Sequence, residues 1–317
     1  MRRAWPVLVI LMIAATAIIL HSRSQRKGIG MTEQPPQKIT PEELADEVEK
    51  ACDAIRAGDC GPSPELWRYG RAIVPPLVPY LRDSNDDVRR QVVALLRAVE
   101  DPAAVPPLLQ AMADPEIEIQ QRAATALYEA YDPQLISKQP SAGPALRKSV
   151  AAGNTSAAAL LLLGYAGGKE TIDLLSQVRE KYAGKKTKLY DWSPAVTVTL
   201  PVNVALSLLG DEEARAALIE TTANDNLDEL RFLLSVLREV DSPRVLHAVS
   251  QALDDTRLTR SGAPRGADSP RRLCDDAINA FVDRLRLEID FPLTDAQTYS
   301  DDQIDQVRQL IRAAIPQ

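Results

Sequence analysis

The chain has 317 residues, of which 45% are apolar and 26% charged, a composition typical of a globular protein. Only 4% are aromatic, while alanine and leucine are abundant, which favours helices over a β-sandwich or β-barrel. The net charge of −7 weighs against broad nucleic-acid binding, and the presence of only two histidines weighs against histidine-based catalytic or metal sites.

Residues 1–27 predict an N-terminal membrane anchor or signal segment. Arg2 and Arg3 precede an uncharged apolar run over residues 4–20. At about 1.5 Å per residue the run spans roughly 25 Å, slightly less than a bilayer core of about 30 Å, and it is long for a cleaved signal. We therefore expect one membrane-anchoring helix, with the remainder exported to the periplasmic or extracellular side. Secretion after signal cleavage, or a cytoplasmic protein that starts at Met31, stay open as alternatives.

Residues 28–40 predict a flexible linker, because Gly28, Gly30, Pro35 and Pro36 lie among polar residues. The preceding segment holds five basic and no acidic residues, which leaves 32 basic against 44 acidic residues after it, a net charge of −12. This acidic balance again weighs against a nucleic-acid partner.

Residues 72–102 and 103–133 repeat each other without gaps at an offset of 31 residues. Nine identities in one register, including the VPPL segments and an aspartate at positions 83 and 114, exclude chance similarity of two helices. Each unit holds two apolar stripes at helical spacing, separated by turn and N-cap residues over 83–86. Because such a helix pair cannot bury both stripes alone, neighbouring pairs are expected to stack.

This pattern resembles the HEAT-repeat family, on the segment AIVPPL followed by D-x-x-x-x-V-R from Asp83 to Val88 and Arg89. The resemblance covers residues 62–133, and the second unit departs from it at Ile119 and Gln120. It implies an all-α, right-handed α-solenoid with a concave and a convex face. Members of the family are mostly scaffolds and adaptors for other proteins, and a few related helical-repeat proteins are enzymes or nucleic-acid binders.

The apolar pattern extends this prediction to one solenoid over residues 41–317, with about six to seven helix pairs. A helix over residues 300–314, with one apolar and one charged side, is expected to cap its end. The pairs are expected near residues 41–70, 71–101, 102–132, 141–166, 168–209, 210–240 and 241–288.

Two insertions, at residues 183–193 and 256–272, interrupt otherwise short connections between the two helices of a pair. Equivalent loops are expected along one edge of a solenoid, where they often build a binding surface. We interpret them as a basic edge for an acidic segment, lipid phosphates or a glycan polymer; two solvated loops, with Trp192 packed on the solenoid, are the alternative. The candidate partner-binding residues are Lys185, Lys186, Lys188, Tyr190, Trp192, Arg257, Arg260, Arg265, Arg271 and Arg272.

Nothing in the sequence predicts catalytic residues, a cofactor or a metal, because nucleotide-binding and zinc-protease motifs are absent and most acidic pairs fall where helices begin. Cys52 and Cys60 have a spacing that permits a disulfide across the first turn, and two free thiols are the alternative. Cys274 is expected to be a buried packing residue.

The sequence thus predicts a non-enzymatic scaffold or adaptor that binds another protein through its solenoid surface, tethered to a membrane through residues 4–20. One alternative is a binder of an anionic polymer or lipid through the two basic loops. The other is a solenoid enzyme, or enzyme subunit, of a lyase-like type.

Overall fold

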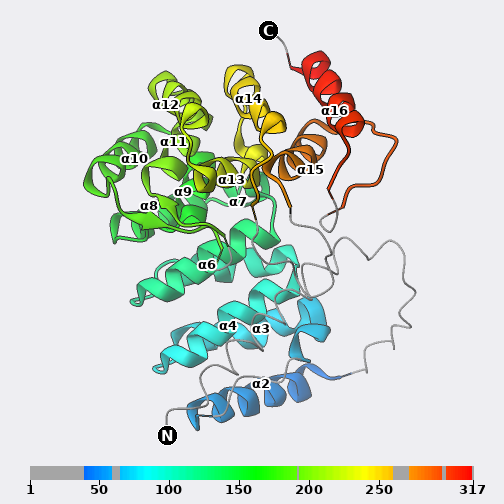
Figure 1. The fold of residues 1–317 in the computed structure, drawn as a ribbon. Coiled ribbons are helices and arrows are strands. Elements are labelled where there is room, and N and C mark those ends of the chain that lie inside the picture. The colour runs from blue at the N-terminus through cyan, green and yellow to red at the C-terminus, as the bar shows by residue number, and fades with distance from the viewer. Residues whose placement is uncertain (1–38, 59–64, 191–192, 260–270, 295–297, 316–317) are drawn as a thin grey trace, which may run out of the picture. The chain divides into compact units, whose positions relative to one another are not determined.

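The computed structural model describes residues 39–58, 65–190, 193–259, 271–294 and 298–315. Residues Thr40–Gln317 form one compact unit that is almost entirely helical. The prediction of an all-α solenoid is therefore confirmed. In Figure 1 the helices α2, α4 and α6 lie one above another, as expected of stacked pairs.

The helices form two layers, because each pair contributes one helix to each layer. We call the layer of first helices the outer layer. It contains α2 Pro41–Arg56, α3 Val74–Leu77 continued by the 3-10 helix η2 Val78–Arg82, α5 Val105–Ala111, α8 Ala142–Ala151, α10 Lys169–Lys181, α12 Glu212–Ala223, and α14 Pro243–Val249 continued by η5 Ser250–Asp254.

We call the layer of second helices the inner layer, in which α4, α6, α9 and α11 contact one another in turn. It contains η1 Leu66–Ile73, α4 Asp86–Val99, α6 Ile117–Ala130, α9 Ala157–Ala166, α11 Thr199–Leu208, α13 Leu227–Ser235 followed by η4 Leu237–Glu239, and α15 Leu273–Leu285. The short helices η3 Pro102–Ala104 and α7 Pro133–Ser137 join neighbouring pairs, and α16 Asp301–Ala314 packs on α15 and η5 at the end.

Proline and capping side chains decide where these helices begin. The VPPL segments place proline in the first turn of α3 and α5, where its missing N–H costs no hydrogen bond. Asn85 caps α4 by accepting from the N–H groups of Asp87 and Val88, and Thr40 and Glu43 form a capping box at α2.

Three successive turns between outer and inner helices share one hydrogen-bond pattern. The side chains of Asp83, Asp114 and Asn154 each accept from the N–H group two residues later, at 2.8, 2.8 and 3.1 Å. Arg89 of α4 donates to the carboxylate of Asp114, with Nε 2.8 Å from Oδ2, and to the carbonyl of Asp83 at 2.9 Å. This buried ion pair ties one repeat to the next.

We call this series of linked turns the ladder of turns. Its next step, from the turn at Asp114 to the turn at Asn154, is made by uncharged side chains. Gln120 occupies the position of Arg89 and donates to the carbonyl of Asp114 at 2.6 Å. Its Oε1 accepts from the Ser149 hydroxyl at 2.7 Å, and that hydroxyl accepts from Asn154 at 2.9 Å. The second repeat thus has Gln120 where the Val-Arg pattern places an arginine. The following turn correspondingly has the amide of Asn154 where the preceding turn has the carboxylate of Asp114.

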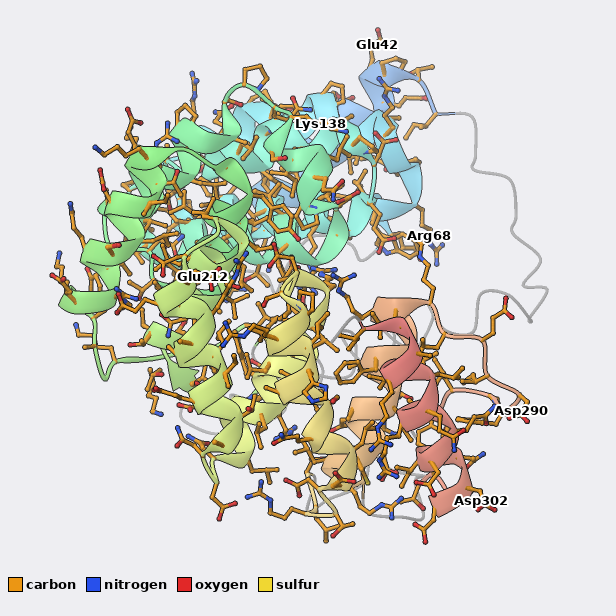
Figure 2. All side chains as sticks on the ribbon, turned by 90° about the horizontal axis from the view of Figure 1, so that it is seen from above. Glu42, Arg68, Lys138, Glu212, Asp290 and Asp302 are labelled. Atoms are coloured by element: carbon orange, nitrogen blue, oxygen red, sulfur yellow. The ribbon has the colours of Figure 1, made fainter. Side chains whose placement is uncertain are left out.

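The core lies between the two layers and is centred on α9, whose residues from Ala157 to Gly164 are all buried. Gly164 packs directly against α11, since a Cβ atom built there would lie 3.0 Å from the Cα of Ala205. Charged side chains lie around the outside of the unit, as Figure 2 shows at Glu42, Asp290 and Asp302.

The predicted membrane-anchored localisation requires correction. Among the residues that the structure describes, no helix is both long enough and apolar enough to cross a bilayer. Residues 4–20, on which the anchor and the signal-cleavage alternative depended, and most of the linker at 28–40, lie outside the described residues.

Candidate functional site

Polar side chains from three inner-layer elements meet where α6 and α9 end, beside η4. We call Tyr128, Tyr165, Arg238 and Glu239 the Tyr–Glu cluster. Tyr128 comes from α6, Tyr165 from α9, and Arg238 and Glu239 from η4. The cluster thus gathers residues that lie up to 111 positions apart in the sequence.

Glu239 is the centre of this cluster, and its side chain is completely buried. One carboxylate oxygen accepts from the Tyr128 hydroxyl at 2.9 Å and from Nε of Arg238 at 2.7 Å. The other accepts from the Tyr165 hydroxyl. A buried carboxylate is tolerated only when such donors replace its water shell, so each donor is needed where it stands.

Arg238 closes the cluster on its exposed side. Its guanidinium carbon lies 4.4 Å from the centre of the Tyr128 ring, and its Nη2 donates to the Tyr128 carbonyl at 3.2 Å. The side chain nevertheless keeps 46% of its surface exposed. Arg238 therefore presents a fixed cation on top of a buried acid and an aromatic ring.

Burial raises the pKa of the Tyr128 hydroxyl well above its ordinary value, and the Glu239 carboxylate raises it further. The same two causes raise the pKa of Tyr165. Burial alone would lower the pKa of Arg238. The interactions of its guanidinium with Tyr128 and Glu239 are larger in sum, so the pKa of Arg238 is raised. At neutral pH both hydroxyls are protonated and act as hydrogen-bond donors, which is the state the geometry requires.

The first insertion begins beside the start of α9, where the Thr187 hydroxyl donates to the Thr155 carbonyl at 2.9 Å, and its residue Tyr190 lies near the cluster. Its ends pair as a short antiparallel hairpin of β1 Lys186–Thr187 and β2 Val196–Thr197, with Lys186 opposite Thr197 and Thr187 opposite Val196. Tyr190 follows the buried Leu189, and burial, with the nearby carboxylate of Glu129, raises the pKa of Tyr190 to about 12. The charges of Arg238 and Glu239 also act on Tyr190, so this residue belongs to the same surroundings.

Lys185, Lys186 and Lys188 of this insertion are exposed, and within the described part of the chain they have no ion-pair partner. The ammonium group of Lys185 lies 5.2 Å from the centre of the Tyr182 ring. Trp192 lies outside the described residues. The first insertion therefore keeps three cations available to solvent.

The second insertion differs, because its described arginines form internal ion pairs. Arg257 pairs with Asp255 and Asp225, while Arg271 is buried and pairs with Asp276. These placements differ from the expectation that both residues face a partner.

Arg272 holds the completely buried Asp275 through two hydrogen bonds of 3.1 and 2.9 Å, which also departs from a partner-facing role. Backbone bonds such as Thr259 N–H to the Arg271 carbonyl, at 2.8 Å, close the base of the insertion. Arg260 and Arg265 lie outside the described residues.

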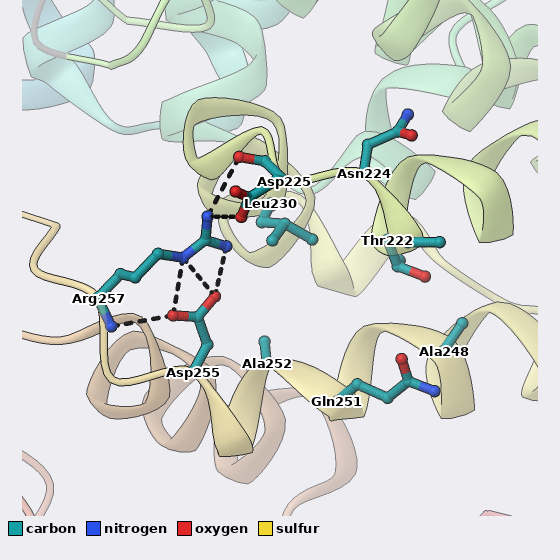
Figure 3. Close-up of a pocket in the computed structure, with 10 residues that line it drawn as sticks. Thr222, Asn224, Asp225, Leu230, Ala248, Gln251, Ala252, Asp255 and Arg257 are labelled. Carbon is teal, nitrogen blue, oxygen red and sulfur yellow. Dashed lines mark hydrogen bonds and ion pairs between the residues drawn. The ribbon is translucent and has the colours of Figure 1, made fainter.

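A shallow pocket of about 400 Å³ lies beside this base, between the end of α12 and η5. Figure 3 shows Arg257 spanning Asp225 and Asp255 at one end, with Ala248, Gln251 and Ala252 along one wall. The guanidinium that lines the pocket is thus already bound to two carboxylates of the chain. The pocket has no free cation for an anionic ligand among its lining residues.

The cysteines take packing positions. Cys52 is buried, and burial raises the pKa of its thiol to about 11. Cys60 lies outside the described residues, so the pairing of Cys52 with Cys60 stays a prediction. Cys274 is completely buried in α15, and burial raises its pKa as well. In the described ranges, histidine, cysteine and acidic side chains form no group that could hold a metal ion.

Two stacked helical layers and short turns define the chain as an α-solenoid protein. Residues 74–156 match the family model described as HEAT repeats, which confirms the resemblance to HEAT repeats over this part of the chain. No curated protein matches it. One similar solved structure is the complex of CpcE and CpcF of phycocyanin lyase from Nostoc sp. PCC7120, with a TM-score of 0.49, 16% identity, and coverage of 90% of this chain and 100% of that chain.

Proposed function

We propose that this solenoid is a non-catalytic scaffold that binds an acidic segment of another protein. The binding surface consists of Lys185, Lys186, Lys188, Tyr190 and Arg238, which we call the basic surface. The observation that carries the proposal is the contrast between the insertions: the first keeps unpaired exposed lysines, whereas the described arginines of the second are bound to carboxylates of the chain.

The composition of the basic surface supports protein recognition. Tyrosine and arginine are enriched among the residues that contribute most to protein–protein binding, because they offer large contact area together with a polar group. Arg238 is held on the Tyr128 ring before any partner arrives, so little side-chain entropy remains to be lost on binding. The three lysines add long-range attraction for an acidic partner.

The same geometry supports a role without catalysis for Glu239. Both oxygens of its carboxylate accept hydrogen bonds from side chains of the chain itself. A general base needs a lone pair directed at a substrate proton, and a buried carboxylate with three internal donors is poorly suited to that task. We therefore assign Glu239 to the support of Arg238.

Differential capture tests the proposal. The full chain and a variant with Lys185, Lys186 and Lys188 changed to serine are used as baits in cell extract. A second variant changes Lys138, Lys148 and Lys169, which are also exposed, and so removes the same charge elsewhere. A protein partner is expected to bind the full chain and the second variant and to be depleted at least tenfold, about 1.4 kcal/mol, from the first.

A photo-crosslinker at position 188 identifies the contacted peptide, with one at position 148 as the control. The proposal expects peptides rich in aspartate or glutamate from position 188 only. A partner retained equally by all three baits would place binding elsewhere on the solenoid. Capture of a nucleic acid or polysaccharide in place of a protein would favour the anionic-polymer alternative, and turnover of a captured small molecule would favour the enzyme alternative.

A further inference from the structure

The Tyr–Glu cluster connects helix pairs that are not neighbours. In a solenoid each repeat ordinarily contacts only the repeats before and after it. Tyr128 lies in the third helix pair and Glu239 in the sixth, yet their side chains are hydrogen-bonded at 2.9 Å. Nη2 of Arg238 also reaches the backbone of Tyr128. Two contacts therefore pass over the fourth and fifth pairs.

These contacts close a ring of four inner-layer elements. Helix α6 contacts α9, α9 contacts α11, and α11 contacts η4. The bond from Tyr128 to Glu239 joins the last element to the first, and the Tyr165 hydroxyl of α9 binds the same carboxylate. A change of curvature that separates α6 from η4 would strip donors from a completely buried carboxylate.

We propose that the Tyr–Glu cluster is a conformational lock, which fixes the curvature of the third to sixth helix pairs. Stability in a simple solenoid is a sum of repeat terms and nearest-neighbour terms, so its ends open independently of its middle. With the lock in place, opening of η4 and opening of α6 both break the same bonds. One set of bonds thus holds both elements closed, a coupling between pairs that are three apart, and loss of these bonds weakens both elements.

Hydrogen exchange of the full chain tests this coupling, with Tyr128→Phe as the variant. The amide groups of Glu239 and Val240 report on η4, since they donate to the carbonyls of Val236 and Leu237 at 2.9 and 3.1 Å. The proposal expects exchange in η4 to accelerate about tenfold, the change expected from the loss of one buried hydrogen bond of about 1.4 kcal/mol. Exchange in α6 accelerates by a similar factor.

Tyr131→Phe is the matched control. Tyr131 is the residue directly after α6. Like Tyr128 it is buried, and its hydroxyl donates to the backbone carbonyl of Leu96 at 3.1 Å. Its partner belongs to the adjacent pair, so its removal is expected to accelerate exchange in α4 and α6 and to leave η4 unchanged. Tyr131→Phe therefore shows the exchange pattern expected when α6 is loosened and the Tyr–Glu cluster stays intact.

Acceleration that stays in α4, α6 and α9 in Tyr128→Phe, with η4 unchanged, would overturn the proposal. Should Tyr128→Phe not fold, Tyr165→Phe removes a less buried hydroxyl from the same carboxylate, and η4 is again expected to exchange faster. Small-angle X-ray scattering supplies an independent readout. The radius of gyration is expected to rise in the lock variants and to stay at the parent value in Tyr131→Phe, and equal radii throughout would count against the lock.

Discussion

At the scale of single residues, the ladder of turns shows that a buried polar side chain is acceptable only together with its partner. Arg89 and Asp114 carry opposite charges and are both nearly inaccessible, with side chains 8% and 3% exposed. One step later, Gln120 and Asn154 fill the corresponding places without charge and are joined through Ser149. Either combination satisfies its hydrogen bonds, whereas a mixed combination would bury an unpaired charge.

Arg89→Ala is therefore expected to lower the free energy of unfolding by about 3–5 kcal/mol, because it leaves the carboxylate of Asp114 buried without its cation. The double variant Arg89→Gln with Asp114→Asn copies the uncharged step and is expected to regain most of that loss. Urea unfolding measures both. Arg122→Ala, which breaks an exposed pair with Glu118, is the control and should cost about 0.5 kcal/mol or less. A double variant as unstable as the single one would refute this account.

The tyrosine hydroxyls predict a loss of stability at high pH. Burial raises the pKa of Tyr128 in the folded chain above its unfolded value of about 10. The stabilising effect of the protonated hydroxyl is complete below that unfolded value, and it is lost as the pH rises toward the folded one. Unfolding free energies measured between about pH 8 and 11 are expected to converge for the parent and Tyr128→Phe. If the unfolding free energies of the two proteins differ by the same amount at every pH in this range, the pKa of Tyr128 does not change on unfolding.

At the scale of elements, the approach of α9 to α11 depends on one glycine. A Cβ atom at Gly164 would lie 3.0–3.1 Å from the Cα, Cβ and carbonyl oxygen of Ala205, and two of these three are backbone atoms that cannot turn aside. The nearest atom to a Cβ at Gly143, in α8, is Nη1 of Arg147 at 3.2 Å, the end of a flexible side chain. The two helical glycines therefore differ in what an added methyl group would displace.

Gly164→Ala is expected to destabilise the chain by about 1–3 kcal/mol, because the two helices must move apart to accept the methyl group. Gly143→Ala is expected to be neutral, or to stabilise by up to about 1 kcal/mol through its higher helix propensity. Thermal and urea unfolding of both variants measure the difference. Equal effects at the two sites would show that the α9–α11 contact adjusts freely.

At the scale of the whole unit, sequence reasoning succeeds where contacts are local or periodic. The stripes of apolar residues and the VPPL segments predicted helices that stack, since each helix needs only its own period and its neighbour. The Tyr–Glu cluster was not predicted, because it depends on curvature that accumulates over several pairs. The available signal was the recurrence of tyrosine near the ends of two inner helices, at Tyr128 and Tyr165, and it gave no hint of the acid at Glu239.

The two basic insertions illustrate the same limit. Their charge and length were evident from the sequence, but the partners of their cations were not. Asp225 belongs to the connection before α13 and meets Arg257 only when α12 packs on α14, which η5 continues. The distinction between a bound and an available cation is therefore a property of the packed unit.

The bond between Tyr128 and Glu239 also limits how this protein can change its length in evolution. Repeat proteins commonly gain or lose whole units, because each unit fits any neighbour of its kind. An extra pair between α6 and η4 would separate the two side chains by roughly 10 Å, the distance between packed helices, and would break the bond. Duplication or deletion of a pair is therefore expected to be accepted outside residues 117–239 and rejected within them.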